Sequence, residues 1–102
     1  VIKVKSGTVI YHIPVNEIFY IEHLNFKSVI VTGDRKIETY ESLVNLAKML
    51  PKDKFKQCHR SIWVNTSYID IVDLKKDEIK LKNGMCCSLG KTFRKEFAKY
   101  AV

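Results

Sequence analysis

Residues 55–65 read Phe-Lys-Gln-Cys-His-Arg-Ser-Ile-Trp-Val-Asn and form the most distinctive stretch of the chain. An apolar anchor, a thiol, an arginine, a tryptophan and an asparagine stand close together here. Arg60 is the residue type best suited to bidentate contact with the O6 and N7 acceptors of guanine, and also to phosphate oxygens. Ser61 and Asn65 fit either a phosphate contact or a turn cap, with Asn65 favoured as a turn former, while Trp63 fits the core.

Outward from this stretch, apolar and polar residues alternate with a period of two. Segments of this kind, rich in β-branched and aromatic residues, predict about nine short strands. They lie at residues 2–5, 9–13, 18–22, 27–32, 36–40, 55–58, 68–74, 79–82 and 85–89. Between the last two, Asn83-Gly84 predicts a type I′ hairpin turn, which needs positive φ at both central residues. The sequence therefore predicts a mostly β domain with several small antiparallel sheets.

Two segments have helical spacing instead. Ser42 suits the N-cap position of a short helix near 42–50, and Pro51 ends that helix. A C-terminal helix near 91–100 is predicted because one of its faces is apolar. That face carries Phe93, Phe97, Tyr100 and Ala101. Because a long region of strand pattern separates the two helices, a helix-turn-helix is excluded.

The length and charge of the chain narrow the class of protein. A chain of 102 residues holds one domain, and 18 basic against 11 acidic side chains give a net charge of +7. Residues 52–102 alone carry twelve basic and six acidic side chains. This imbalance favours a polyanionic partner over an enzyme with an acidic cleft. The sequence has no apolar run long enough for a membrane span, so no membrane partner is expected. Three cysteines without a secretory signal predict reduced thiols in a cytoplasmic protein.

Three stretches look like catalytic or metal-binding motifs, but their residue spacing or side-chain directions do not fit those motifs. Residues 84–92 resemble a phosphate-binding loop, but five residues rather than four separate the two glycines. Cys58 and His59 are neighbours on a predicted strand, so their side chains point to opposite faces. The adjacent Cys86 and Cys87 lack the spacer that lets two thiolates reach one zinc ion. We therefore predict no enzyme activity, no cofactor and no metal site.

The stretch at residues 55–65 resembles the F-x-x-C/V-H-R/N-S-x-x-V-N core motif of the LytTR DNA-binding domain family. Residues 17–22 are similar to that family's early strand, and residues 40–43 to the entry of its first helix. Residues 89–93 are similar to the segment before its last helix. Together these segments extend the resemblance over nearly the whole chain.

The resemblance implies a β-β-β sandwich of about ten strands in three small antiparallel sheets. It also implies the function of a C-terminal output domain of a bacterial response regulator, in which loops read successive major grooves of double-stranded promoter DNA. Residues 1–102 are then a single DNA-binding domain, and the missing initiator Met marks a fragment without its receiver domain. Further expected partners are that receiver domain in the full-length chain and a second copy, as a dimer on direct-repeat DNA.

Carried over by position, the resemblance implies three places that face base edges. They are the loop at Asn25, Lys27 and Ser28, then Arg60, and then Lys91. Lys91 stands where the family usually has arginine, which keeps the charge but loses the planar fork, so phosphate contact becomes as good a role as base reading. The residue before it is glycine where the family commonly has serine.

The DNA backbone candidates are His59, Ser61, Asn65, Arg94 and Lys95. His59 has two roles in balance, since a histidine within a strand also fits a purely structural position. The lysines of the last helix also fit a solvated face.

The cysteines suggest a further hypothesis. Cys58 lies on the motif strand, and Cys86 or Cys87 lies on the strand that leads to Lys91. If those strands are neighbours, oxidation of a Cys58 and Cys86 pair would distort both loops, although buried inert thiols are the favoured reading.

Two other functions remain open from the residues alone. A small β-rich single-strand or RNA-binding module would stack bases on an exposed platform formed by Tyr20, Phe26 or Tyr68. A protein-interaction barrel of the SH3 type is the third reading, but it gives no account of the basic second half.

Overall fold

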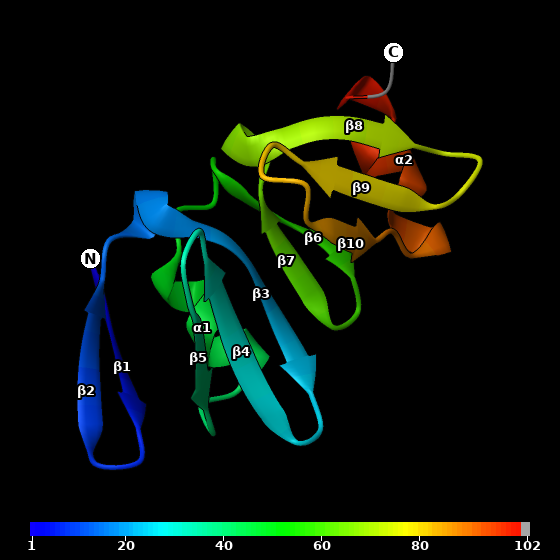
Figure 1. The fold of residues 1–102 in the computed structure, drawn as a ribbon. Helices are drawn as coiled ribbons and strands as arrows, with labels where there is room; N and C mark the ends of the chain where they lie inside the picture. The colour runs from blue at the N-terminus through cyan, green and yellow to red at the C-terminus, as the bar shows by residue number, and fades with distance from the viewer. Residues whose placement is uncertain (101–102) are drawn as a thin grey trace.

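Ten short strands form three antiparallel sheets in this structure, a computed structural model that describes residues 1–100 (Figure 1). The strands are β1 (Ile2–Ser6), β2 (Val9–Ile13), β3 (Ile18–Leu24), β4 (Lys27–Thr32), β5 (Lys36–Thr39), β6 (Phe55–His59), β7 (Ile62–Asn65), β8 (Ile69–Asp73), β9 (Glu78–Leu81) and β10 (Cys86–Ser88). The same residues contain two α-helices, α1 (Leu43–Met49) and α2 (Arg94–Phe97). They also contain four 3-10 turns, η1 (Val15–Glu17), η2 (Thr66–Tyr68), η3 (Lys91–Phe93) and η4 (Ala98–Tyr100). The expected ten strands in three antiparallel sheets are confirmed.

The three sheets lie in a row along the longest dimension of the molecule, which measures 43 × 23 × 22 Å (Figure 1). The β1–β2 hairpin lies at one end, and the β10-β9-β8 sheet lies at the other with α2. Between them stands a five-stranded sheet with the order β5-β4-β3-β7-β6. The hydroxyl of Thr39 on β5 donates to the carbonyl of Lys5 on β1 at 2.7 Å and ties the first hairpin to the central sheet.

The central sheet contributes side chains from its two faces to two different hydrophobic cores. Successive side chains of a strand point to opposite faces, so one strand can serve both cores. On β3, Ile21 is buried in the core beneath β1, β2 and α1, whereas Tyr20 packs against the core beneath the β8–β10 sheet and α2. On β7, Trp63 packs on the first core and Val64 is buried in the second. The central sheet is therefore the middle layer of a three-sheet sandwich.

All nine strands predicted from alternation are present, and each observed boundary lies within two residues of the predicted one. The tenth, β7, was not predicted from alternation. It has only four residues and follows β6 after a two-residue turn, so residues 55–65 form a single hairpin. Ile62, Trp63 and Val64 are all apolar because they face two cores, which hides the period of two that marks a strand with one wet face.

The first helix forms as predicted. The Ser42 side chain accepts a hydrogen bond from the backbone N–H of Asn45 at 3.1 Å, and the helix ends before Pro51. The predicted helix near 91–100 is shorter and less regular, because only residues 94–97 are α-helical and a 3-10 turn lies on either side. Phe97 is its one fully buried residue, and Ala101 lies outside the described residues. No helix within residues 1–100 combines the length and apolar character needed to cross a membrane.

The prediction of a type I′ turn at Asn83-Gly84 is wrong, since only Gly84 has a positive φ, at 88°. In the β9–β10 connection the N–H of Leu81 donates to the carbonyl of Met85, and this bond closes a loop of three residues between them. A type I turn followed by a glycine in the left-handed region is the common geometry for a loop of that length. The type I′ turn lies instead between β3 and β4, where Asn25 and Phe26 have φ values of 52° and 65°.

Phe26 is an unusual residue for a type I′ turn. A side chain with a Cβ in the left-handed region costs about 1–2 kcal/mol relative to a glycine, and Phe26 is 92% exposed, so burial does not offset that cost. We expect Phe26→Gly to raise the free energy of unfolding by about 1 kcal/mol, after the entropy cost of glycine is subtracted. Urea unfolding followed by tryptophan fluorescence measures this change.

Tyr40→Gly is the matched control, because Tyr40 is also an exposed aromatic residue, at 80%, but has no positive φ. This control should lower the stability. A loss of stability in both variants would show that the turn stores no strain.

Candidate nucleic-acid interface

The turn of the β6–β7 hairpin is held by its own side chains and presents Arg60 to solvent. The backbone N–H of Ser61 donates to Nδ1 of His59 at 3.1 Å, and the Gln57 amide donates to the Arg60 carbonyl at 3.4 Å. A register shift between Gln57 and His59 marks a bulge, which re-aims the end of β6. Arg60 itself is exposed and forms no ion pair with any residue in the range 1–100. Its guanidinium is therefore available for an anionic partner.

The β3–β4 turn presents a second group of the predicted residues. Asn25 and Phe26 are exposed at its tip, and the half-buried Lys27 holds its ammonium 5.4 Å from the centre of the Tyr40 ring. Ser28 points the other way: it is fully buried, and its hydroxyl has no hydrogen-bond partner among the described residues. The turn thus offers Asn25 and Lys27 at the surface, whereas Ser28 belongs to the interior.

Lys91, the third of the predicted base-reading places, begins η3, and η3 packs against β6. The N–H of Gly90 donates to the carbonyl of Cys58 at 2.8 Å. A Cβ built on Gly90 would lie 3.1 Å from Cδ2 of Phe93 and 3.6 Å from Cα of His59. The Phe93 ring would have to shift by a few tenths of an ångström to admit a Cβ at position 90, whereas the distance to His59 is an ordinary contact. Lys91 is exposed beside the end of β6.

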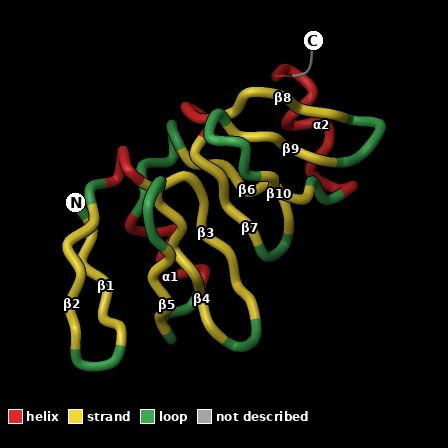
Figure 2. The backbone as a smooth tube through the Cα atoms, viewed as in Figure 1, coloured by secondary structure: helices red, strands yellow, loops and turns green. Residues whose placement is uncertain are grey.

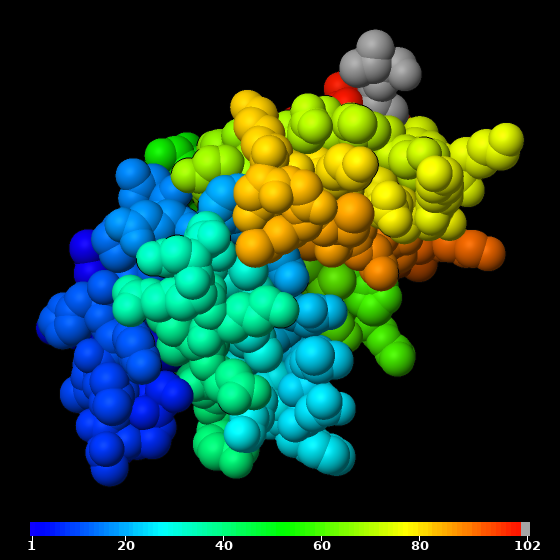
Figure 3. Space-filling model, in the orientation of Figure 1, coloured from blue at the N-terminus to red at the C-terminus, as the bar shows by residue number. Residues whose placement is uncertain are grey.

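Two backbone hydrogen bonds connect the three places through the β6–β7 hairpin. On one side, the N–H of His23 at the end of β3 donates to the carbonyl of Ser61 at 2.9 Å. On the other side, the Gly90 N–H bonds to β6 as described. The β3–β4 and β6–β7 turns project on the same lower side of the molecule (Figures 2 and 3). The structure therefore brings Arg60 between the Asn25 turn and Lys91.

Asn65 is buried, and its side chain forms hydrogen bonds within the protein. It is 2% exposed, its amide donates to the Ile18 carbonyl at 2.9 Å, and its side-chain oxygen accepts from the Ser67 N–H at 3.0 Å. The first bond joins the end of β7 to the start of β3, and the second caps η2. Asn65 thus fixes the position of the hairpin and has no surface left for a direct DNA contact.

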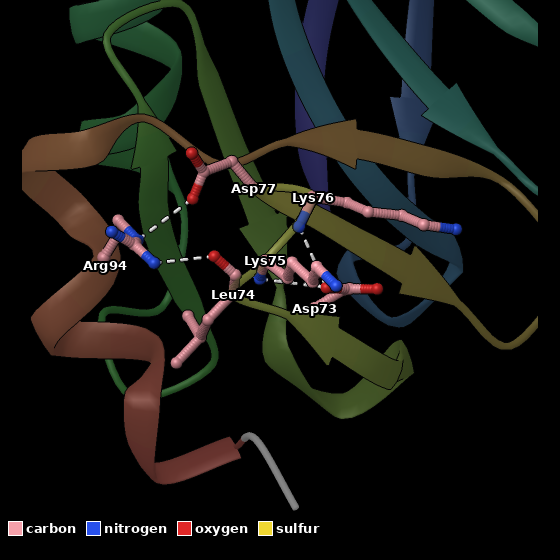
Figure 4. A network of polar contacts seen from close by, with 6 residues as sticks. All are labelled: Asp73, Leu74, Lys75, Lys76, Asp77 and Arg94. Atoms are coloured by element: carbon pink, nitrogen blue, oxygen red, sulfur yellow. Dashed lines mark hydrogen bonds and ion pairs between the residues drawn. The ribbon is translucent and has the colours of Figure 1, made fainter.

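Arg94 is also engaged within the protein (Figure 4). Its Nε lies 3.0 Å from Asp77 Oδ1, and its Nη2 donates to the Leu74 carbonyl at 2.6 Å. Both partners belong to the β8–β9 connection. In the same connection, Asp73 accepts from the N–H groups of Lys76 and Lys75, and the Lys76 bond above all lowers the pKa of that carboxyl. Arg94 therefore links the start of α2 to a well-ordered turn.

The other residues predicted to contact the DNA backbone differ in exposure. Lys95 is exposed, and His59 and Ser61 are half-buried in and beside the turn. Because Nδ1 of His59 accepts the Ser61 N–H, Nε2 is the nitrogen of that ring left to donate to a phosphate. Both functions proposed for His59 are therefore compatible with its geometry.

The three cysteines do not share one environment. Cys58 and Cys87 are buried in the core beneath the β8–β10 sheet, whereas Cys86 is exposed. Burial raises the pKa of Cys58 far above its ordinary value and that of Cys87 to about 12. The structure therefore does not bring Cys58 and Cys86 to one face, and Cys87 is the thiol that shares a core with Cys58.

Within residues 1–100, no cluster of three or more His, Cys, Asp or Glu side chains is placed to hold a metal ion.

The aromatic residues do not gather into one exposed platform. Tyr68 stacks on Phe19 with ring centroids 4.1 Å apart and donates its hydroxyl to the Asn16 carbonyl. Tyr20 is half-buried, and burial raises the pKa of its hydroxyl. Only Phe26 of the three candidates is exposed, and its positive φ was not predicted. Positive φ at a non-glycine pair gives no recognisable sequence signal when the second residue is phenylalanine.

Comparison with known proteins gives a consistent family. The family model of the LytTr DNA-binding domain matches residues 8–101. Among solved structures, the chain is similar to the LytTr DNA-binding domain of a protein described as a methyl-accepting/DNA response regulator from Bacillus cereus. The TM-score is 0.81 at 24% sequence identity, over 96% of this chain and 93% of that one. Comparison with curated protein sequences gives no match.

The internal bonds of Asn65 predict a structural effect when it is truncated. Asn65→Ala leaves the buried Ile18 carbonyl without its donor, so the free energy of unfolding should fall by about 2–3 kcal/mol. Urea unfolding measures the loss. Asn45→Ala is the matched control, because the Asn45 amide bonds to Glu41 at the surface, and its removal should cost less than about 0.5 kcal/mol. Equal losses in the two variants would contradict the anchoring role.

The burial of two thiols predicts their reactivity. At pH 8 the raised pKa values keep Cys58 and Cys87 protonated, and the thiolate is the form that reacts. We expect dithio-bis-nitrobenzoate to label one thiol quickly in the folded protein and three in denaturant. Cys86→Ser should remove the fast phase. Rapid labelling that survives in Cys86→Ser would show that a core thiol is reachable.

Proposed function

The chain belongs to the LytTR DNA-binding domain family, and from this membership we propose that it binds double-stranded promoter DNA sequence-specifically as the output domain of a bacterial response regulator. Its three surface loops would read successive major grooves. The proposal rests on two backbone hydrogen bonds, from His23 to Ser61 and from Gly90 to Cys58, which join the β6–β7 hairpin to the segments that carry the Asn25 turn and Lys91. The family is described as one of DNA-binding domains rather than of enzymes.

The exposure of Arg60 supports a base-reading role. A guanidinium can give two parallel hydrogen bonds to O6 and N7 of guanine. This contact requires an arginine side chain that has no internal partner and stands on a rigid backbone turn. The bonds from Ser61 to His59 and from Gln57 to the Arg60 carbonyl supply that rigidity. Arg60 is therefore the first candidate for reading sequence.

The flanking loops are proposed to extend the same reading. The Asn25 amide fits the N6 and N7 positions of adenine, and Lys27 fits phosphate or guanine. Lys91 lies on the other side of Arg60 and fits a phosphate as well as a guanine acceptor. His59, Ser61 and Lys95 are proposed to contact the DNA backbone around these loops, since phosphate contacts fix the register of the protein on the duplex.

Three of the predicted contacts are proposed to act through contacts within the protein. Ser28 and Asn65 are buried, and Arg94 is engaged with Asp77 and Leu74. Their role is then to position the loops that touch DNA. The buried Ser28 hydroxyl lies under the Asn25 turn, and Arg94 begins the helix that follows Lys91.

The assembly around the domain is also a proposal. Residues 1–102 would be one DNA-binding domain, joined in the full-length chain to a receiver domain that responds to a kinase. Two such chains would bind as a dimer on a direct repeat. The single-strand and RNA alternative gains no support from the aromatic residues, because Tyr20 and Tyr68 are packed into the fold.

The proposal predicts how a duplex should respond to the loss of Arg60. Arg60→Ala should weaken binding to a cognate duplex by about 1–3 kcal/mol and binding to a scrambled duplex only slightly. The cognate duplex is first selected from a random library by repeated binding, and affinities are measured by fluorescence anisotropy over a salt series. The slope against salt counts the phosphates contacted, and the affinity ratio measures specificity.

Arg35→Ala is the matched control for this experiment. Arg35 is an exposed arginine in the β4–β5 connection, at the opposite end of β4 from the Asn25 turn. Its removal should leave the affinity ratio unchanged. An equal loss on both duplexes for Arg60→Ala would make Arg60 a phosphate contact, and absence of duplex binding at low salt would refute the proposed function.

A further inference from the structure

A groove of about 580 Å³ runs between α1 and the β6–β7 hairpin. Its apolar lining comes from Leu43, Val44 and Ala47 of α1 and from Trp63 of β7. Sites for small organic ligands typically have about 300–1,000 Å³ and an apolar lining with a few placed polar groups. The groove has the size and the lining of such a site.

The helix carries more apolar residues than its contact with the core uses. Leu46 is the buried residue of α1 and belongs to the first core. Val44 is 64% exposed, although a short surface helix needs only one apolar stripe. Together with the half-buried Ala47 it forms a second apolar strip that faces the groove rather than the core. The packing of α1 on the first core therefore does not require this strip.

The polar part of the groove has one sign of charge. Lys48, Lys52 and Arg60 line it, and no carboxylate does. Within residues 1–100 the sole ion pair joins Arg94 and Asp77, so none of these three cations is neutralised by an internal partner. In a concave site beside apolar walls, uncompensated cations of this kind attract anions more strongly than they would on a flat surface.

We propose that this groove binds an amphipathic organic anion, with a flat aromatic or short acyl body and a single carboxylate or sulfonate head. The body lies against Val44, Ala47 and Trp63, where an aromatic ring gains from contact with the indole. The head lies between Lys48, Lys52 and Arg60. A polynucleotide does not fit this description, because its phosphates lie on the outside of a wide duplex and offer no apolar body for the floor.

Occupation of the groove has a consequence for the surface around Arg60. Arg60 and Ser61 line the groove and also form the turn proposed to read DNA. An anionic head held by Arg60 competes with a duplex for the same guanidinium. The groove ligand therefore acts as a negative effector of DNA binding, and this part of the inference rests on the proposed function.

Anilinonaphthalene sulfonate is a suitable probe, because it has the required aromatic body and anionic head and fluoresces when its ring leaves water. Titration of the full chain should give saturable binding with one site per chain. Val44→Glu should weaken the affinity at least tenfold, since it places a charged carboxylate on the apolar floor against the bound ring. Lys48→Glu should do the same by reversing a charge at the rim.

Val9→Glu is the matched control, because Val9 is an exposed valine, at 51%, on the distant β1–β2 hairpin. Its binding curve should coincide with that of the unmodified protein. Near-ultraviolet circular dichroism checks that every variant keeps its fold. If Val44→Glu and Lys48→Glu bind the probe as well as Val9→Glu does, the groove is not the site and the inference fails.

A second arm separates this inference from the proposed function. Adding the selected duplex should displace the probe, and adding the probe should raise the apparent dissociation constant for the duplex. Simultaneous binding without any change in either affinity would overturn the competition. If the protein binds no duplex at all, the proposed function fails, while the probe titration still decides whether the groove binds an organic anion.

Discussion

The fold depends on one hairpin that is buried on both sides. In β6 and β7, Phe55 and Trp63 face the first core, and Cys58 and Val64 face the second. A one-residue slip of either strand would exchange these two sets, and each core would receive side chains of the wrong size. The Asn65 amide adds a directional bond to Ile18 at the end of the hairpin. With both faces fixed, the turn has no freedom to rotate, and the backbone at Arg60 is held in one orientation.

Rigidity at the hairpin contrasts with strain at the neighbouring β3–β4 turn. Positive φ at both turn residues fits the twist of a two-residue hairpin, and asparagine accepts it easily, but phenylalanine does not. An exposed residue in a costly conformation needs a reason outside folding, because the fold gains nothing from an unburied ring. The turn and Arg60 are joined through the bond from His23 to Ser61. The strained tip and the rigid hairpin thus form one continuous surface.

The sequence predicted most of the fold and less of the site, for physical reasons. Strands with one wet face show a period of two and were predicted closely, whereas β7 was missed because both of its faces are dry. Asn83-Gly84 misled because the preferred dipeptide sets the φ of its glycine but not the length of the loop. Local sequence also says nothing about a distant partner, so the engagement of Asn65 with Ile18 and of Arg94 with Leu74 could be seen only in three dimensions.

The ion pairs of the structure show where the net positive charge of the chain remains uncompensated. If the surplus of basic side chains were neutralised internally, the net charge would only keep the protein dissolved. Instead, Arg94 is the single basic residue within residues 1–100 that forms an ion pair, and it does so away from the turn that carries Arg60. Uncompensated cations repel one another, and that repulsion falls when an anion binds among them. The same free cations that favour a duplex along the loops therefore favour a small anion in the groove. Arg60, which belongs to both surfaces, is the residue at which the two kinds of binding must compete.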